Sequence, residues 1–189
     1  IDGEDRSQLS MERDFMDSWP LERVAILGAV DWGPMRGWLP KIHFPAGMEG
    51  VKPTRTMVAE LKLFDMWIWY AHCNRSVVQR LEKIQADCGI GQPGTRFLGY
   101  WENAEFARVD HPDAKASFYV RPGEVVLMYV TNFSREPVEV GLALNLAEFG
   151  LRDLSATEAE NSKALSMTDG VLEVDIPPHD FRLIKLTSR

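Results

Sequence analysis

The stretch GEVVLMYVTNFSREPVEVGLALNL, residues 123–146, contains two strand patterns separated by a polar turn. Its first part, 125–130, is apolar on both faces, which is typical of a strand that is covered on both sides. Its second part, 138–146, carries large apolar residues at every second position, which is typical of a strand covered on one face. The pattern predicts a central strand and a neighbour nearer an edge or facing solvent, in the core of a β-sandwich.

Further strand patterns recur on both sides of this stretch, at intervals of roughly ten residues, the spacing of an all-β sandwich. They lie at 116–120, 152–157, 171–176 and 181–187. Asp169-Gly170 and Pro177-Pro178-His179 supply turn residues between the last three strands. The sequence therefore predicts an antiparallel β-sandwich over residues 105–189.

The chain before this sandwich has a mixed pattern. Residues 1–18 are charged and weakly patterned, which indicates a flexible lead-in with a helical turn near 11–16. The apolar run 24–30 stops at DWGP and favours a buried strand, with a buried helical turn as the alternative. The following stretch, 35–53, is rich in Gly, Pro and aromatic residues and is predicted to be a long loop packed against the protein.

Two helices are predicted after this loop. Residues 54–72 carry apolar residues at helical spacing over most of the circumference, with Thr54 as the capping residue after Pro53. A second helix, 76–88, is amphipathic and ends at Gly89. Residues 95–101 return to a strand pattern. We therefore predict an α+β fold, in which an α/β segment over 19–104 precedes the sandwich.

Composition excludes several classes of protein. The formal net charge is −7 and the basic residues do not cluster, which argues against nucleic-acid binding. The most apolar run, 61–71, contains Lys62 and Asp65 and is too short to cross a membrane. The spacing of the histidines and cysteines predicts no metal site, no pattern indicates a cofactor, and Cys73 and Cys88 are expected to be buried free thiols.

The first hundred residues carry more apolar surface than a few short elements can bury. We therefore expect the helix 54–72 to pack on a partner, either the sandwich, a second copy or the remainder of a parent polypeptide. The chain begins with Ile1 and has no signal-peptide pattern, so we interpret it as a processed or excised piece.

Three segments of the second half resemble a known family: GEVVLMYVTNFSREPVEVGLALNLAEFGL, ATEAEN and DGVLEVDIPPHDFRLIKL. Together they resemble the C-terminal β-sandwich of glycoside hydrolases and their relatives, which follows a catalytic (β/α)-barrel. The resemblance covers 114–187, and its most specific part is the closing IPPHDFRL of 176–183. Residues 31–102 look like the end of such a barrel, as in large glycoside-hydrolase-like proteins that include bacterial families.

The resemblance implies a carbohydrate substrate, hydrolysis of O-glycosyl bonds if the parent protein supplies the missing barrel strands, and a secreted or periplasmic location. Glycoside hydrolysis generally uses two carboxyl groups. The candidates here are Asp31, at the end of an apolar run beside Trp32, and Glu102, directly after Tyr100-Trp101. The alternatives are that Asp31 caps a turn before Gly33-Pro34 and that Glu102 lies at a domain junction.

Aromatic residues near these carboxylates are candidates for sugar binding. They are Trp32, Trp38 and Trp101, together with His43 in the aromatic loop. Trp67 and Trp69 lie within the predicted apolar helix, where core packing is the favoured interpretation. We interpret the chain as the C-terminal portion of a glycoside-hydrolase-like protein with the sandwich as a stabilising accessory domain. The alternative is a non-catalytic carbohydrate-binding or assembly module.

Overall fold

The computed structural model describes residues 2–5, 15–28, 37–42, 49–151 and 154–188. These residues form two compact units, Ile1–Leu81 and Glu82–Arg189.

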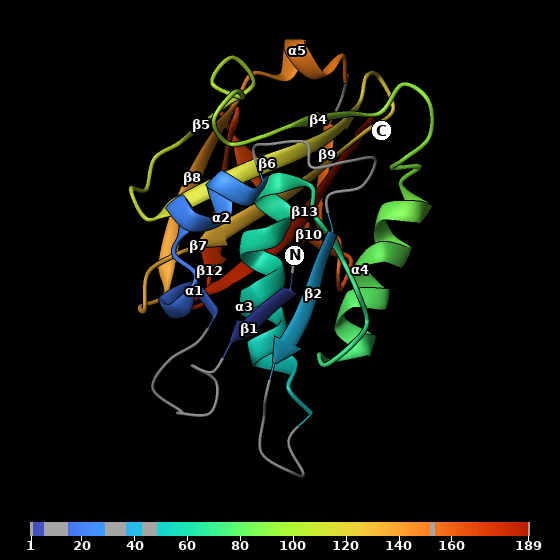
Figure 1. Cartoon of the computed structure of the whole chain (residues 1–189). Helices are drawn as coiled ribbons and strands as arrows, with labels where there is room; N and C mark the ends of the chain where they lie inside the picture. The colour runs from blue at the N-terminus through green and yellow to red at the C-terminus, as the bar shows by residue number, and fades with distance from the viewer. Residues whose placement is uncertain (1, 6–14, 29–36, 43–48, 152–153, 189) are drawn as a thin grey trace. The chain divides into compact units, whose positions relative to one another are not determined.

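Two antiparallel sheets make up the second unit (Figure 1). The larger sheet has the strand order β10-β9-β13-β7-β6-β4, with bounds Lys163–Leu165, Leu154–Glu158, Asp180–Ser188, Val125–Asn132, Ala114–Arg121 and Arg96–Leu98. The smaller sheet has the order β11-β12-β8-β5, with bounds Met167–Thr168, Val171–Ile176, Val138–Leu144 and Ala107–Val109. A short helix, α5 (Leu146–Phe149), follows β8.

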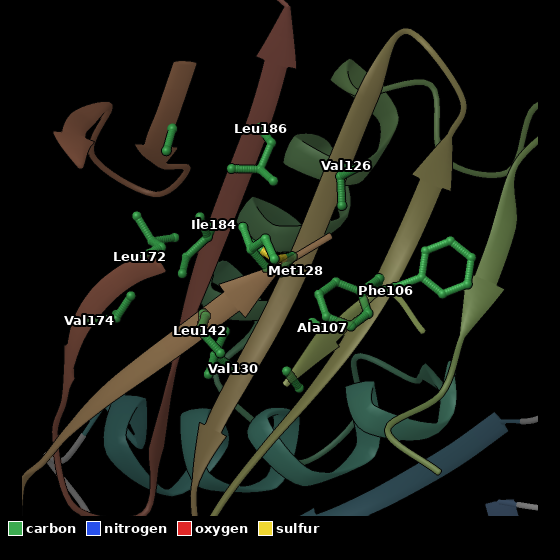
Figure 2. Packing of buried hydrophobic residues seen from close by; sticks show 14 of the residues in the cluster. Phe106, Ala107, Val126, Met128, Val130, Leu142, Leu172, Val174, Ile184 and Leu186 are labelled. Carbon is green, nitrogen blue, oxygen red and sulfur yellow. The ribbon is translucent and has the colours of Figure 1, made fainter. Parts of the chain in front are cut away.

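One hydrophobic core is built from both sheets (Figure 2). Val126, Met128 and Val130 of β7 share this core with Leu142 of β8 and Leu172 of β12, all of them buried. The residues of β7 that alternate with them, such as Leu127 and Tyr129, are also fully buried. The predicted β-sandwich is therefore confirmed, and so is the central position of its first strand.

The two strands of the stretch 123–146 do not pair with each other, which corrects the prediction that the second strand is the neighbour of the first. β7 pairs with β6 and β13, whereas β8 lies in the smaller sheet between β12 and β5. Residues 133–137 therefore cross from one sheet to the other. The alternating pattern of β8 reflects one face in the core and one face toward solvent, where Glu139 is exposed, and does not reflect an edge position.

Asn132 occupies the corner where two such crossings meet. Its side-chain amide donates hydrogen bonds to the carbonyl oxygens of Glu136 (2.8 Å), Ile176 (3.2 Å) and Pro177 (3.0 Å). Its Oδ1 accepts a hydrogen bond from the backbone N–H of Ser134 (2.7 Å). Because Asn132 itself is fully buried, one side chain fixes both the exit from β7 and the turn between β12 and β13.

Asp169-Gly170 is a turn before β12, as predicted, and it closes a two-residue hairpin between β11 and β12. Both residues have positive φ, 50° for Asp169 and 79° for Gly170, as a turn that matches the strand twist requires. The short strands β5, β10 and β11 were not predicted, because two or three residues are too few to establish an alternating pattern.

Parallel strands form the sheet of the first unit, with the order β1-β2-β3. Helices lie between these strands in the chain. The elements in order are β1 (Asp2–Asp5), α1 (Phe15–Ser18), α2 (Leu21–Gly28), β2 (Gly37–Ile42), α3 (Val51–Leu61) with a 3-10 turn (Lys62–Phe64), and β3 (Trp67–Ile68). The helix α4 (Arg75–Asp87) follows β3. Strand and helix thus alternate, as in (β/α) folds.

The run 24–30, predicted as a strand, is helical over its described part. In α2, Val24 and Gly28 are buried and lie one turn apart, whereas Ile26 between them is 67% exposed. The apolar run therefore has one buried face. Gly28 packs directly on Phe64, and a Cβ at this position would lie 2.7 Å from the Phe64 side chain, so the approach requires glycine.

The predicted loop 35–53 contains β2, and the predicted lead-in 1–18 contains β1 and α1. Burial alternates strictly along β2, with Trp38, Pro40 and Ile42 buried. This strand is difficult to predict from the sequence because it contains Gly37 and Pro40 among aromatic residues, and proline and glycine are uncommon inside strands. The lead-in is held by parallel pairing of β1 with residues 39–42 of β2.

The predicted helix 54–72 is shorter than its apolar pattern. α3 begins at Val51. Pro53 is tolerated in its first turn, because the N–H that proline lacks would have no helical partner there. The helix ends at Leu61, and the 3-10 turn that continues it ends where Asp65 adopts φ 55° and the N–H of Met66 donates to the carbonyl of Leu61 (3.3 Å). Met57, Val58 and Leu61 of this helix are fully buried, and the expected packing of the helix on a partner stays a prediction.

The helix α4 matches its predicted range and its predicted end. Its first turn is capped by Asn74, whose Oδ1 accepts a hydrogen bond from the N–H of Val77 (3.0 Å). Gly89 at its end has φ 68°, which confirms the left-handed terminating residue.

The two compact units divide the chain at residues 81–82, whereas the boundary expected from the sequence lies at 104–105. The strand β4 belongs to the second unit, because it pairs with β6 in the larger sheet.

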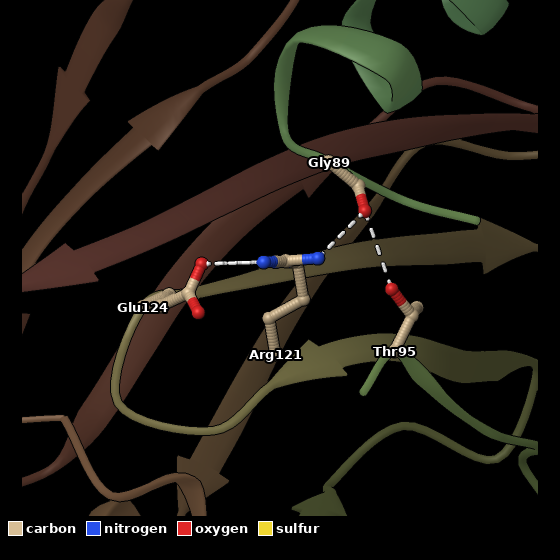
Figure 3. Close-up of polar contacts among 4 residues, drawn as sticks. All are labelled: Gly89, Thr95, Arg121 and Glu124. Atoms are coloured by element: carbon tan, nitrogen blue, oxygen red, sulfur yellow. Dashed lines mark hydrogen bonds and ion pairs between the residues drawn. The ribbon is translucent and has the colours of Figure 1, made fainter. Parts of the chain in front are cut away.

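Arg121 holds the end of α4 (Figure 3). Its Nη1 donates a hydrogen bond to the carbonyl of Gly89 (3.1 Å), which also accepts one from Thr95 Oγ1 (3.2 Å). Its Nε and Nη2 donate to Oε2 of Glu124 (3.0 and 2.7 Å). The side chain of Arg121 is only 18% exposed, whereas that of Glu124 is 64% exposed.

Replacing Arg121 by alanine is expected to lower the free energy of unfolding by about 1–2 kcal/mol, because Gly89 loses a charged donor and Thr95 alone remains. Replacing Glu124 by alanine is the matched control, with an expected loss below about 0.5 kcal/mol, since its ion pair is exposed. Urea unfolding of both variants measures the difference. Equal losses in the two variants would contradict the role assigned to Arg121.

Candidate functional site

Glu102, one of the two predicted catalytic carboxylates, lies on an exposed turn. Its Oε1 accepts a hydrogen bond from the N–H of Gly99 (3.2 Å), and its own N–H donates to the Gly99 carbonyl (3.0 Å). The carboxylate thus closes a tight turn after β4. Asp31, together with the predicted binding residues Trp32 and His43, lies outside the described residues, so the carboxylate pair stays a prediction.

Trp101 presents an aromatic surface next to this turn. It is 46% exposed and meets Tyr100 edge to face, with ring centroids 5.2 Å apart. Its indole lies against the backbone of Gly99, where a Cβ would collide with the ring. A half-exposed ring on a fixed backbone has the form of a sugar-stacking residue, and its role in binding stays a prediction.

Trp38, also predicted to bind substrate, has no exposed face to offer a sugar. It is fully buried and meets Phe15 and Trp19 edge to face, at centroid distances of 5.6 and 5.1 Å. The physical reason is its position on β2, where the even-numbered residues are buried. Its indole N–H has no hydrogen-bond partner among the described residues.

Trp67 and Trp69 are not on a helix, contrary to the prediction. Trp67 begins β3, and Trp69 directly follows this strand, with its N–H bonded to the carbonyl of Trp38 (3.0 Å). The two indoles meet at a centroid distance of 4.8 Å and an angle of 68°. Trp69 is 49% exposed, so the pair is an aromatic surface that the helical interpretation of 54–72 concealed.

The second unit contains an open groove of about 510 Å³ near Tyr100. Its polar wall includes Asn103, Arg108, Asp110, His111 and Lys115. Two of these groups are fixed: Asn103 is buried and donates to the Ala116 carbonyl (2.6 Å), and Asp110 accepts a hydrogen bond from the Gly141 N–H (2.7 Å). No periodic pattern in the sequence of residues 100–116 indicates this groove.

No group of three or more His, Cys, Asp or Glu side chains in the described part of the chain is arranged to hold a metal ion. The helices of that part are all too short or too polar to span a lipid bilayer.

Cys73 and Cys88 are free thiols, as predicted; Cys88 is buried and Cys73 half-buried. Burial raises the pKa of the Cys73 thiol from its ordinary value of 9.0 to about 11, and it raises the pKa of Cys88 as well. The neutral thiol is therefore favoured in the folded state. The contribution of the neutral Cys73 thiol to the free energy of unfolding is complete below pH 9 and is lost as the pH rises from 9 toward 11.

Alkylation of Cys73 by iodoacetamide at pH 8 is expected to be about a hundredfold slower in the folded protein than in urea, because the thiolate is the reactive form. The rate should rise steadily as the pH approaches 11. Mass spectrometry of the two cysteine peptides measures each rate separately. Equal rates in folded and unfolded protein at pH 8 would contradict the raised pKa.

The arrangement described so far, helices alternating with parallel strands and then an antiparallel sandwich, is of the class found in glycoside hydrolases. Residues 79–167, slightly less than half of the chain, match the family model described as glycoside hydrolase 123, C-terminal domain. The match includes the greater part of α4 and all of β4, so it begins earlier than the resemblance at 114–187 and also ends earlier, at residue 167. The resemblance to the C-terminal part of a glycoside-hydrolase-like protein is confirmed.

Solved structures of glycoside hydrolases share this fold. Two crystal structures of a β-L-arabinopyranosidase of family GH27 from Geobacillus stearothermophilus align with TM-scores of 0.54 and 0.55, at 15% and 16% identity. They cover 95% and 94% of this chain and 44% of their own. The structure of AmyP in complex with maltose aligns with a TM-score of 0.57 at 8% identity, covering 87% of this chain and 43% of its own.

At these identities the likeness concerns the fold alone. The chain spans less than half the length of the solved structures that it matches. A search of curated proteins found no match. The α+β fold class predicted from the sequence is confirmed.

Proposed function

We propose that this chain is the C-terminal portion of a glycoside-hydrolase-like, carbohydrate-active protein, in which it supplies the end of a (β/α)-barrel and the sandwich that follows it. The observation that carries the proposal is the order of the elements. Three parallel strands with intervening helices precede an antiparallel sandwich, and the match to the glycoside hydrolase 123 C-terminal domain covers the strands of this sandwich from β4 to β10.

The parallel sheet supports the proposal that further barrel strands belong to the protein. Among the described residues, β1 and β3 each pair with β2 alone, so each has an edge without a partner strand. A closed (β/α) barrel has eight parallel strands in about 250 residues. A barrel continuing from these edges would give the two strands their missing neighbours.

The sandwich is proposed to act as a stabilising accessory domain. Its core is continuous across both sheets and contains large side chains that are completely buried, such as Phe118 and Phe149. Such a core is rigid and can serve as a base for the mobile loops of a catalytic barrel. Of the carboxylates that we propose as catalytic, Asp31 precedes the sandwich in the chain, whereas Glu102 follows β4, the first strand of the larger sheet.

Hydrolysis assays on the full-length polypeptide that contains this chain test the proposal. A panel of aryl glycosides should contain at least one substrate that is hydrolysed. Asp31→Asn and Glu102→Gln are expected to reduce kcat by at least about a hundredfold, the scale of general acid–base catalysis. Glu139→Gln is the matched control, because Glu139 is an exposed carboxylate on the outer face of β8.

The exposed Trp69 and Trp101 favour a second candidate, a non-catalytic carbohydrate-binding module. The assay separates the two functions. Saturable binding of an oligosaccharide without hydrolysis of any glycoside would support the binding module, whereas turnover would support the hydrolase. Neither binding nor turnover across the panel would contradict both candidates.

A further inference from the structure

The two faces of the parallel sheet differ in what covers them. Trp38 of β2 pairs with Ile68 of β3, so their side chains share one face, and both are fully buried. Trp38 packs against Phe15 of α1 and against Trp19 directly after it. This is therefore the helix-covered face of the sheet.

Trp67 and Trp69 lie on the opposite face. A Cβ on Gly37 would lie 3.3 Å from Nε1 of Trp69 and 3.7 Å from Cε3 of Trp67, so both indoles lie over this glycine. Gly37 is the neighbour of Trp38 in β2 and its side chain position points away from the helix-covered face. The absence of a side chain at Gly37 is what allows both rings to rest on the strand.

In a (β/α) barrel the helices surround the strands, so the face without helices is the interior. The carboxyl ends of the strands form the mouth in which substrates bind. Trp69 comes directly after the last residue of β3, which places it at the carboxyl end of this strand. The tryptophan pair therefore occupies the position where a barrel of this type would meet its substrate.

We propose that Trp67 and Trp69 form a stacking subsite for a pyranose ring of a carbohydrate substrate. This inference rests on the proposed function and assigns it a binding surface. Rings that meet at 68° and 4.8 Å present an L-shaped apolar surface, with one indole as floor and the other as wall. The apolar C–H face of a pyranose fits the floor, while its hydroxyl groups remain free for polar partners.

The pair is preorganised for binding. The backbone N–H of Trp69 donates to the Trp38 carbonyl (3.0 Å), and the carbonyl of Trp69 accepts a hydrogen bond from the Cys73 thiol (3.7 Å). The backbone of Trp69 is thus fixed by hydrogen bonds at both its N–H and its carbonyl group. Because the rings are already ordered, a sugar that binds them loses little of its binding free energy to side-chain ordering.

Trp69→Ala, Trp69→Phe and Ile26→Ala in the full-length polypeptide test this subsite. Ile26 is the matched control, because it is an exposed apolar residue, 67% accessible, on α2. We expect Trp69→Ala to raise KM, or the Kd of an oligosaccharide measured by calorimetry, about tenfold, with kcat changed less than KM. Trp69→Phe should retain most of the affinity, and Ile26→Ala should leave it unchanged. Circular dichroism establishes that each variant is folded.

Fluorescence supplies a second readout that does not depend on hydrolysis. Acrylamide should quench an emission component in the parent protein that is missing from Trp69→Phe, and a bound oligosaccharide should protect it. If the protein hydrolyses or binds a sugar and Trp69→Ala and Trp69→Phe bind as well as the parent, the subsite is overturned while the proposed function stands. If no sugar binds, both fail. A Trp69 that acrylamide does not reach would show a ring buried by the remainder of the barrel, which also overturns the subsite.

Discussion

Replacing Asn132 by alanine is expected to lower the free energy of unfolding of the sandwich by about 3 kcal/mol or more. The substitution removes the amide that donates to three carbonyl oxygens, those of Glu136, Ile176 and Pro177. It also removes the acceptor for the Ser134 N–H. Buried polar groups that lose a partner each cost about 1–3 kcal/mol, so even partial rescue by water leaves a large effect. Hydrogen exchange of the β7 and β13 amides measures the loss where it arises.

Two further variants separate this role from a general loss of polarity. Asn132→Asp keeps the acceptor but places a carboxylate opposite three carbonyl oxygens, so it should destabilise at least as much as alanine. Asn161→Ala is the matched control, because Asn161 is exposed and bonds only within its own turn. A loss below about 1 kcal/mol for Asn132→Ala would contradict its role in joining the two crossings.

The second large effect is expected for Phe118→Ala, with a loss of about 3–5 kcal/mol in the free energy of unfolding. Phe118 lies in β6 at the centre of the core, is fully buried, and packs against Phe149 at a centroid distance of 6.0 Å. Alanine leaves a cavity that the surrounding strands cannot fill, because both neighbours of β6 are hydrogen-bonded along their length. Urea unfolding followed by far-ultraviolet circular dichroism measures this loss.

Phe118→Leu is the control for the volume of the cavity. Leucine keeps most of the apolar contact, so its expected cost is about 1–2 kcal/mol. A parent protein that is more stable than the Phe118→Leu variant, which in turn is more stable than the Phe118→Ala variant, would support a core that is closely packed around β6. Equal stability of the leucine and alanine variants would indicate that the site collapses freely, contrary to the packing described here.

Much of the sandwich was predictable, because its long strands carry their own patterns. β7 is apolar at every position from Val125 to Val130, and such a run is compatible only with burial on both faces. The pairing of a strand with its neighbours cannot be predicted from such a pattern. The turn residues between β7 and β8 resemble those of a hairpin, and the crossing between sheets is revealed by long-range contacts, namely the strand pairings of β7 and β8 and the bonds of Asn132.

The first unit was less predictable because its elements are short and its patterns run together. The apolar series from Met57 to Ile68 continues through α3, the 3-10 turn and β3, so helical spacing alone does not reveal where the helix ends. The left-handed conformation of Asp65 separates helix from strand, and an aspartate in that role has no distinctive sequence signal. The same error hid the tryptophan pair, since a residue assigned to a buried helix is not sought at a binding surface.

Among the described residues, β1 and β3 each have an edge without a partner strand, which also bears on how the isolated chain behaves in solution. A strand edge with free N–H and C=O groups is a template for joining another chain, and β3 is too short to carry the protective charges or bulges that long edge strands use. Preparations of this chain alone are expected to self-associate in a concentration-dependent way, by adding strand to strand. An apparent dimer seen by light scattering would therefore replace the barrel strands that we propose and would be a poor guide to the native assembly.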